Sequence, residues 1–230
     1  AADVIFLTNY FSTKVGQGFD SGAFSARAYC AVIFRVGFEP ILIADDPDVR
    51  SEVIAVSDFR IASNPVAKVI ETITNLGISE EIGFVGSDFF PMKYWIELQK
   101  EIPQIRWKIC DDLVRCRRLI KSDEEKDVIR IAGQIASQAM TQMIEALLSG
   151  KTEAEAAGLA AHDIVAAGGV VDKIQVSHGD TIGYTCGDPI AGYRKLSPKT
   201  GDLFRAFLIG PMYQGCLLYT SPSPRDQRGS

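Results

Sequence analysis

The hydrophobic period of the chain changes near residue 115, and this change constrains the fold more than any other feature. Before it, short β-branched and aromatic segments alternate with helix-like segments. After it, apolar residues recur every three or four positions over long stretches, as they do on one face of a helix. We therefore predict two parts, an α/β domain over residues 1–115 and a second domain over residues 116–215 that begins with helices.

The ends of the elements are marked in residues 1–115. Asn64 supplies a capping side chain before Pro65, whose missing N–H costs nothing at the first helical position, so a helix is predicted up to Gly77. A second helix is expected from Phe89 to Glu101. Short, β-branched or aromatic segments bounded by Gly, Pro or Asp are expected to be strands: residues 3–7, 29–35, 39–44, 81–86 and 105–110.

Two capping boxes mark the helices of the second part. Ser122 and Glu125 have the spacing at which each side chain bonds a free backbone N–H at a helix start, and Thr152 and Glu155 repeat it. The first helix is expected to end at Gly150, and the second, rich in Ala, before residues 168–169. The first helix carries an apolar stripe at Val128, Ala132, Ile135, Ala139, Met143 and Ala146.

Charge and composition exclude several partner classes. The 230 residues include 24 basic and 29 acidic side chains, a net charge of −5 that disfavours nucleic acid and anionic membranes as partners. No apolar run reaches the ~18 residues of a membrane span, and the first residues lack the basic segment of a signal peptide. The five cysteines include no close pair, as in a cytoplasmic protein with reduced thiols. We expect a cytoplasmic protein.

Three segments in order resemble one family. "RLIKSDEEKDVIRIA" (118–132), "LLSGKTEAEAAGLAA" (147–161) and "KTGDLFRAF" (199–207) are similar to the creatinase/aminopeptidase P/Xaa-Pro dipeptidase family. The resemblance covers about residues 3–215. It implies a creatinase-type N-terminal α/β domain over 1–115, followed by the truncated first half of an α+β pita-bread domain over 116–215.

The resemblance implies a function for the parent protein. Family members hydrolyse C–N bonds, so we expect a hydrolase of peptide, amide or amidine bonds that acts on a small peptide or amide substrate as a homodimer. The truncated chain itself is expected to be inactive. The alternative is a pita-bread domain that has lost catalysis and binds peptide or protein partners.

The resemblance also implies a site for divalent metal (Mn, Co or Zn), held by two Asp, one His and two Glu. The first Asp is expected five residues past Asp202, where this chain has Phe207. Residues 203–215 contain no acidic side chain, so we assign no metal ligand and no cofactor in this chain. Either the protein belongs to a metal-free branch, as creatinase does, with a histidine that handles protons, or a different register moves the carboxylate further along the chain.

The chain has only two histidines. His178 lies in a glycine-rich region where family members carry a site histidine, so the resemblance implies it as the candidate catalytic residue. The alternative is a loop histidine that pairs with Asp180. His162 lies inside the Ala-rich helix, and we expect it to have no catalytic role.

The last fifteen residues depart from everything before them. "CLLYTSPSPRD", from Cys216, has no hydrophobic period and resembles the translation of a sequencing adapter. We expect residues 216–230 to be a non-native, disordered tail. The alternative is a natural tail rich in Pro and Ser.

Overall fold

A computed structural model describes residues 2–10, 29–45, 51–183, 192–214 and 216–217. Contacts divide the chain into two compact units, Ala1–Ile120 and Lys121–Ser230. The predicted boundary near Arg115 falls inside α4 (Asp112–Leu119), which contacts α1 (Ala2–Thr8) and so belongs to the first unit. The division therefore follows α4, and the domain types expected for residues 1–115 and 116–215 stay predictions.

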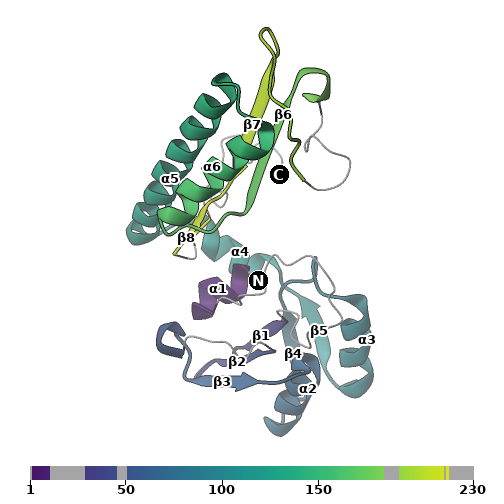
Figure 1. The fold of residues 1–230 in the computed structure, drawn as a ribbon. Coiled ribbons are helices and arrows are strands. Elements are labelled where there is room, and N and C mark those ends of the chain that lie inside the picture. The colour runs from purple at the N-terminus through teal and green to yellow at the C-terminus, as the bar shows by residue number, and fades with distance from the viewer. Residues whose placement is uncertain (1, 11–28, 46–50, 184–191, 215, 218–230) are drawn as a thin grey trace. The chain divides into compact units, whose positions relative to one another are not determined.

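The first unit contains two small groups of strands. β1 (Cys30–Ile33) and β2 (Ile41–Ala44) pair antiparallel, and β3 (Asp58–Ile61) joins β2 in parallel. β4 (Glu81–Phe84) and β5 (Arg106–Ile109) form a separate parallel pair. Parallel strands need a crossover between them, and α3 (Met92–Glu101) supplies it for β4 and β5 (Figure 1).

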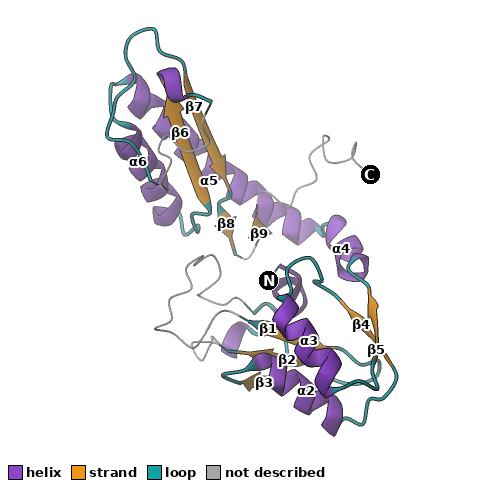
Figure 2. Ribbon diagram, turned by 90° about the vertical axis from the view of Figure 1, so that its right-hand side faces the viewer, coloured by secondary structure: helices purple, strands orange, loops and turns teal. Residues whose placement is uncertain are grey.

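Helices cover these strands and close the core of the first unit. α2 (Pro65–Asn75) contacts β1 and β2 (Figure 2), and the side chain of Asn64 accepts a hydrogen bond from the Ala67 amide, which confirms the predicted cap. The ring of Phe84 packs against Trp95 and Trp107. Apolar residues from these helices and the loops beside them are buried together: Val66, Ile73, Leu98, Ile102 and Ile105.

Three features of the first unit differ from the sequence prediction. Residues 3–7, expected to be a strand, belong to helix α1, where Thr8 Oγ1 donates a hydrogen bond to the Val4 carbonyl at 2.7 Å. A short apolar run fits either a strand or a helix, so its period could not decide. The sequence also did not indicate β3 or α4. β3 has only four residues, of which Asp58 and Arg60 are charged and pair with each other.

In the second unit two helices lie on a pair of strands. α5 (Asp123–Leu148) and α6 (Glu153–Ala166) pack side by side, and α6 contacts β6 (Lys173–His178) while α5 contacts β7 (Phe204–Ile209) (Figure 1). β6 and β7 pair antiparallel. The buried cluster between helices and strands confirms the predicted stripe from Ala132 to Ala146 and the Ala-rich face of α6, where Ala156 and Ala160 are fully buried.

Both predicted capping boxes are confirmed. Ser122 Oγ accepts a hydrogen bond from the Glu125 amide, and the Glu125 carboxylate accepts one from the Ser122 amide. Thr152 and Glu155 make the same reciprocal pair at the start of α6. These bonds raise the stability of the ionised Glu155 side chain, so its pKa lies below the ordinary value.

The start of the expected tail is structured. Cys216 and Leu217 form β9 (Cys216–Leu217), which pairs antiparallel with β8 (Met212–Tyr213) across a two-residue connection. Gln214 in that connection has a φ of 45°, as turns between adjacent strands often require. The expectation of disorder from residue 216 is therefore wrong for its first two residues, and residues 218–230 lie outside the described part of the chain.

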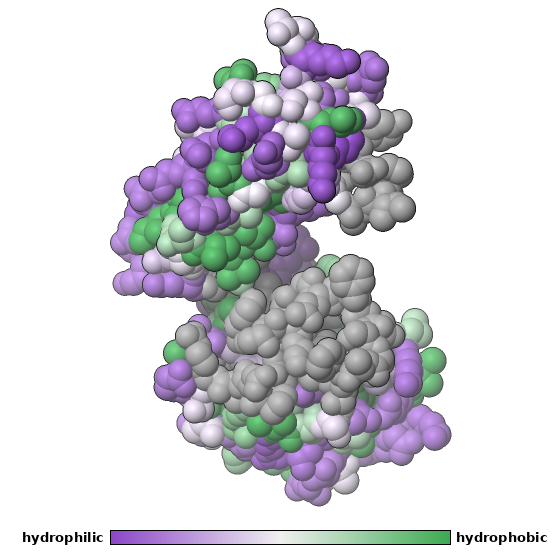
Figure 3. All heavy atoms as spheres, viewed as in Figure 1, coloured by the Kyte–Doolittle hydropathy of each residue, from purple (hydrophilic) through white to green (hydrophobic). Residues whose placement is uncertain are grey.

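The surface of the second unit carries both hydrophilic and hydrophobic side chains. Figure 3 shows hydrophilic and hydrophobic side chains side by side over the face that carries α5 and α6 in this view. Leu148 and Val165 are among the apolar residues that remain exposed. Within the described residues, no helix combines the length and apolar character that crossing a membrane requires.

Met143→Ala is expected to lower the free energy of unfolding of the second unit by about 2–5 kcal/mol, because Met143 is fully buried and its loss leaves a cavity. The helical circular dichroism signal in a denaturant titration measures this loss. Both tryptophans, Trp95 and Trp107, lie in the first unit, so the fluorescence transition should not move. Leu148→Ala, on the exposed side of the same helix, is the control; an equal loss in both variants would contradict the buried placement.

Thr152→Ala is expected to lower the same free energy by about 1 kcal/mol, because the cap of α6 is lost. The pKa of Glu155 is lowered in the folded state, so its contribution is present above its unfolded pKa and is lost as the pH falls through the folded value. The variant should therefore lose less stability on acidification than the parent chain does. Titrations at neutral and acidic pH measure both effects, and Thr141→Ala, which removes an exposed hydroxyl in α5, is the control.

Candidate functional site

The pairing of β6 and β7 decides where the two predicted site positions lie. Residues directly opposite in an antiparallel pair share a face of the sheet, and successive residues alternate. Val176 and Ala206, which are opposite each other, pack in the core beneath the helices. His178 lies two residues after Val176 and therefore on the helix side, whereas Phe207 lies on the other side. The structure does not bring His178 and Phe207 together.

A buried carboxylate meets His178 on the helix side. Glu153, the first residue of α6, has no exposed surface, and its Oε1 lies 2.6 Å from Nδ1 of His178. The guanidinium of Arg194 donates to both carboxylate oxygens, from Nε at 3.0 Å and from Nη2 at 2.6 Å. The expected alternative partner of His178, Asp180, lies in the short turn that follows β6. His178 instead contacts a residue 25 positions earlier.

The chain around Arg194 also caps α6 through its backbone. The amides of Glu153 and Ala154 donate to the carbonyls of Leu196 and Arg194, both at 3.1 Å. Together with the capping box, these bonds satisfy the first three N–H groups of the helix, which have no partner within it. A negative side chain at this end is also favoured by the helix dipole. The segment from Arg194 to Leu196 is thus attached to the start of α6 by side chain and by backbone.

Of the three residues in this cluster, the sequence analysis identified only His178 and missed Glu153 and Arg194. Glu153 stands between the two residues of the second capping box, a position typical of an exposed first-turn acid. Nothing in the residues around Arg194 distinguishes it from a surface arginine. The catalytic role of His178 stays a prediction. His162 has a side chain that is 73% exposed and lies 3.1 Å from the carboxylate of its neighbour, Asp163.

A turn at Gly201 and Asp202 precedes β7. Gly201 has a φ of 93°, a region that side-chain-bearing residues rarely adopt. The Asp202 carboxylate accepts a hydrogen bond from the Lys199 amide at 2.9 Å. This acid therefore stabilises the turn that leads into β7.

The residues at the expected metal position do not fit a cation. Phe207 is 49% exposed, and the strand positions that share its face include Lys173 and Arg205. β6 and β7 carry no acidic residue. In the described ranges, no three His, Cys, Asp or Glu side chains are grouped as a metal ion requires. Hard and borderline cations need converging oxygen or nitrogen ligands, which the residues on this face do not supply.

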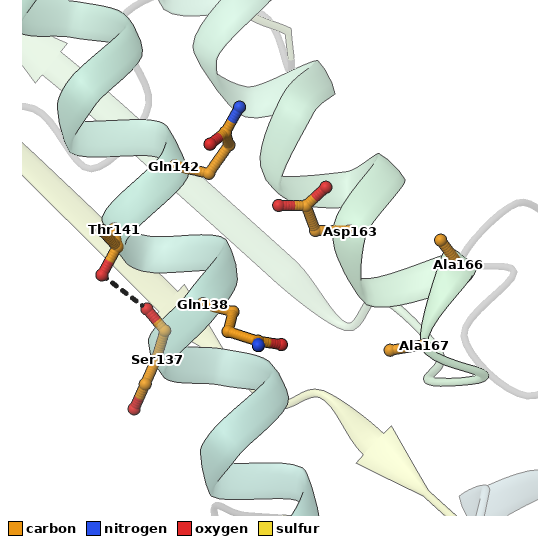
Figure 4. Close-up of a pocket in the computed structure, with 7 residues that line it drawn as sticks. All are labelled: Ser137, Gln138, Thr141, Gln142, Asp163, Ala166 and Ala167. Carbon is orange, nitrogen blue, oxygen red and sulfur yellow. Dashed lines mark hydrogen bonds between the residues drawn. The ribbon is translucent and has the colours of Figure 1, made fainter.

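An open groove runs between the two helices on the outside of the second unit. Ser137, Gln138, Thr141 and Gln142 line it from α5, and Asp163 faces them from α6 (Figure 4). The hydroxyl of Thr141 is already bonded to the Ser137 carbonyl. The groove contains short polar side chains without a nucleophile and base pair, so it is not a candidate for catalysis.

A carboxylate also organises a loop in the first unit. Asp111 accepts hydrogen bonds from the amides of Gly86 and Ser87, at 2.7 and 3.0 Å, and from the Ser87 hydroxyl. The hydroxyl and amide donors hold the pKa of Asp111 below its ordinary value. All three donors belong to the loop after β4, so the role of Asp111 is to stabilise this loop.

Comparison with known proteins gives matches in sequence and in fold. No family model matches the chain. A Xaa-Pro dipeptidase of Pyrococcus horikoshii is 34% identical over 90 residues, which are 39% of this chain and 23% of that protein.

Solved structures match over more of the chain. They include X-Pro aminopeptidase of Thermotoga maritima (TM-score 0.66, 14% identity, 93% of this chain and 55% of that one). Prolidase of Pyrococcus furiosus has a TM-score of 0.67 at 18% identity, over 93% of this chain and 60% of that one. Aminopeptidase P of E. coli has a TM-score of 0.64 at 15% identity, over 94% and 51%.

The structural matches, at these identities, establish the fold alone. The chain spans between about half and 60% of the length of those solved structures. The sequence match adds a relation to a curated dipeptidase. The chain is thus similar to Xaa-Pro peptidases in fold over most of its described length, and to a Xaa-Pro dipeptidase in sequence over 90 residues.

Proposed function

We propose that the protein to which this chain belongs hydrolyses a C–N bond in a proline-containing peptide or in a small amide or amidine. The observation that carries the proposal is the 34% identity over 90 residues to a protein named Xaa-Pro dipeptidase. The shared fold with an X-Pro aminopeptidase and a prolidase supports it. The first unit then serves as the creatinase-type N-terminal domain, and the second as the first part of a pita-bread domain.

The proposal extends to the assembly and to the isolated chain. We propose that the whole protein is a cytoplasmic homodimer and that this chain alone is inactive. The face of the β6–β7 pair that carries Phe207 supports inactivity, because Phe207 and the basic residues on that face supply no group that activates water. In the family, this position belongs to a metal-binding aspartate. His178 is the residue of this chain proposed to hold or move a proton.

The apolar residue at position 207 bears on the type of chemistry. A half-exposed Phe in place of a ligand supports a metal-free reaction of the creatinase type, in which a histidine carries the proton and polar groups orient the substrate. It also supports a second candidate function, a pita-bread domain that binds peptides or proteins without cleaving them.

These proposals are tested with the longer protein, encoded by the source reading frame without the adapter-like segment that begins at Cys216. Purified protein is assayed on Xaa-Pro dipeptides and on creatine, with and without Mn²⁺, Co²⁺ or Zn²⁺, beside the 230-residue chain as the control. Turnover by the longer protein and none by the chain is expected. Activity that survives chelation supports the metal-free reaction. Absence of turnover under every condition, together with peptide binding, would establish the binding module instead.

A further inference from the structure

Glu153, Arg194 and His178 form the most buried group of ionisable side chains that the described residues contain, and its geometry specifies a protonation pattern. Glu153 has no exposed surface and His178 has 7%. We propose that Glu153 is a positioning residue that holds the His178 imidazole as the Nδ1–H tautomer and leaves Nε2 as its basic nitrogen. The proposal rests on the proposed function only where it connects Nε2 with proton transfer.

The charge on Glu153 is compensated by its surroundings. A carboxyl group out of contact with water remains ionised only when a cation and hydrogen bonds compensate it. Arg194 provides both, since its Nε and Nη2 donate to different oxygens of the carboxylate at 3.0 and 2.6 Å. Such a two-point pair is the strongest that arginine makes with a carboxylate. Glu153 is therefore ionised and has only acceptor atoms.

The ionised carboxylate fixes the tautomer of His178. His178 Nδ1 lies 2.6 Å from Oε1 of Glu153, and an ionised carboxylate has no proton to donate. The proton between the two atoms must therefore reside on Nδ1. In neutral imidazole only one nitrogen carries a proton, so Nε2 has the lone pair. Both ring contacts that the described residues make fall on Nδ1, from Glu153 Oε1 at 2.6 Å and from Arg194 Nη2 at 3.4 Å. The shorter contact decides the tautomer, because Nη2 already donates to Glu153 at 2.6 Å and 3.4 Å is long for a hydrogen bond.

The carboxylate also fixes the position of the His178 ring. His178 ends β6, and the opposite residue, Phe204, begins β7. Arg194 lies in the connection between these strands and is attached to α6 by the bond from the Ala154 amide to its carbonyl. One carboxylate therefore fixes the end of β6 and the connection to β7 against the start of α6. Loss of its charge should release both the tautomer and the attachment.

Nitrogen NMR of the ¹⁵N-histidine-labelled 230-residue chain tests the tautomer directly. The chain has two histidines, and a His162→Gln variant assigns the signals. At neutral pH we expect His178 to show a protonated Nδ1 and an unprotonated Nε2. A protonated Nε2 with an unprotonated Nδ1 in the unaltered chain would overturn the proposal. This measurement needs no catalytic turnover, so it is separate from the test of the proposed function.

Glu153→Gln tests the role of the carboxylate. The amide can donate to Nδ1 as well as accept from it, so the Nδ1–H population should fall. Hydrogen exchange at the amides of residues 153 and 154, which bond to the carbonyls of Leu196 and Arg194, should become about tenfold faster or more, as loss of a charge-assisted bond predicts.

Glu155→Gln is the matched control. It lies on the same first turn, keeps the same shape and bonds Thr152 instead of His178. In this variant, the His178 tautomer and the exchange rates of the amides of residues 153 and 154 should match those of the unaltered chain. Equal effects in both variants, or no change in Glu153→Gln, would show that Glu153 does not position His178. If Glu153→Gln fails to fold, the tautomer of the unaltered chain still decides.

Discussion

The second unit depends on the pairing of one buried charge. The carboxylate of Glu153 has no contact with solvent, and it is compensated by the guanidinium of Arg194 and by the imidazole of His178. Breaking a buried ion pair by removing one partner typically costs about 3–5 kcal/mol, because the other charge is left without compensation. The start of α6, the end of β6 and the connection before β7 are therefore held in one arrangement.

The ionisable cluster lies on one of the two faces that side-chain alternation gives the β6–β7 pair. The helix side holds Val176, Ala206 and the ionisable cluster, whereas the other side holds Phe207. The resemblance implied a metal-binding aspartate at position 207, and this chain has Phe207 there. The residue proposed to transfer a proton, His178, and the position expected to bind metal, Phe207, therefore lie on opposite faces of the same two strands.

Elements with strong local signals could be predicted from the sequence. The capping boxes at Ser122 and Thr152 and the Asn64 cap were correct because each bond joins residues three positions apart. The buried stripe of α5 was also correct, because long helices repeat their period many times. Residues 3–7 were misassigned, since a run of four apolar residues, from Val4 to Leu7, fits the period of a strand and of a helix. β3 is too short, and too dependent on pairing with β2, for its own residues to indicate a strand.

The sequence by itself determined where the main helices of the second unit begin, which of their faces are apolar, and which family motifs the chain shares, because these are properties of neighbouring residues. Only the tertiary structure decided the environment of His178. Its partners lie 25 positions earlier, at Glu153, and 16 positions later, where Arg194 donates to the His178 carbonyl. Contacts over such separations depend on how the helices and strands pack. A glutamate that looks like an ordinary first-turn acid is, for this reason, the buried centre of the candidate site.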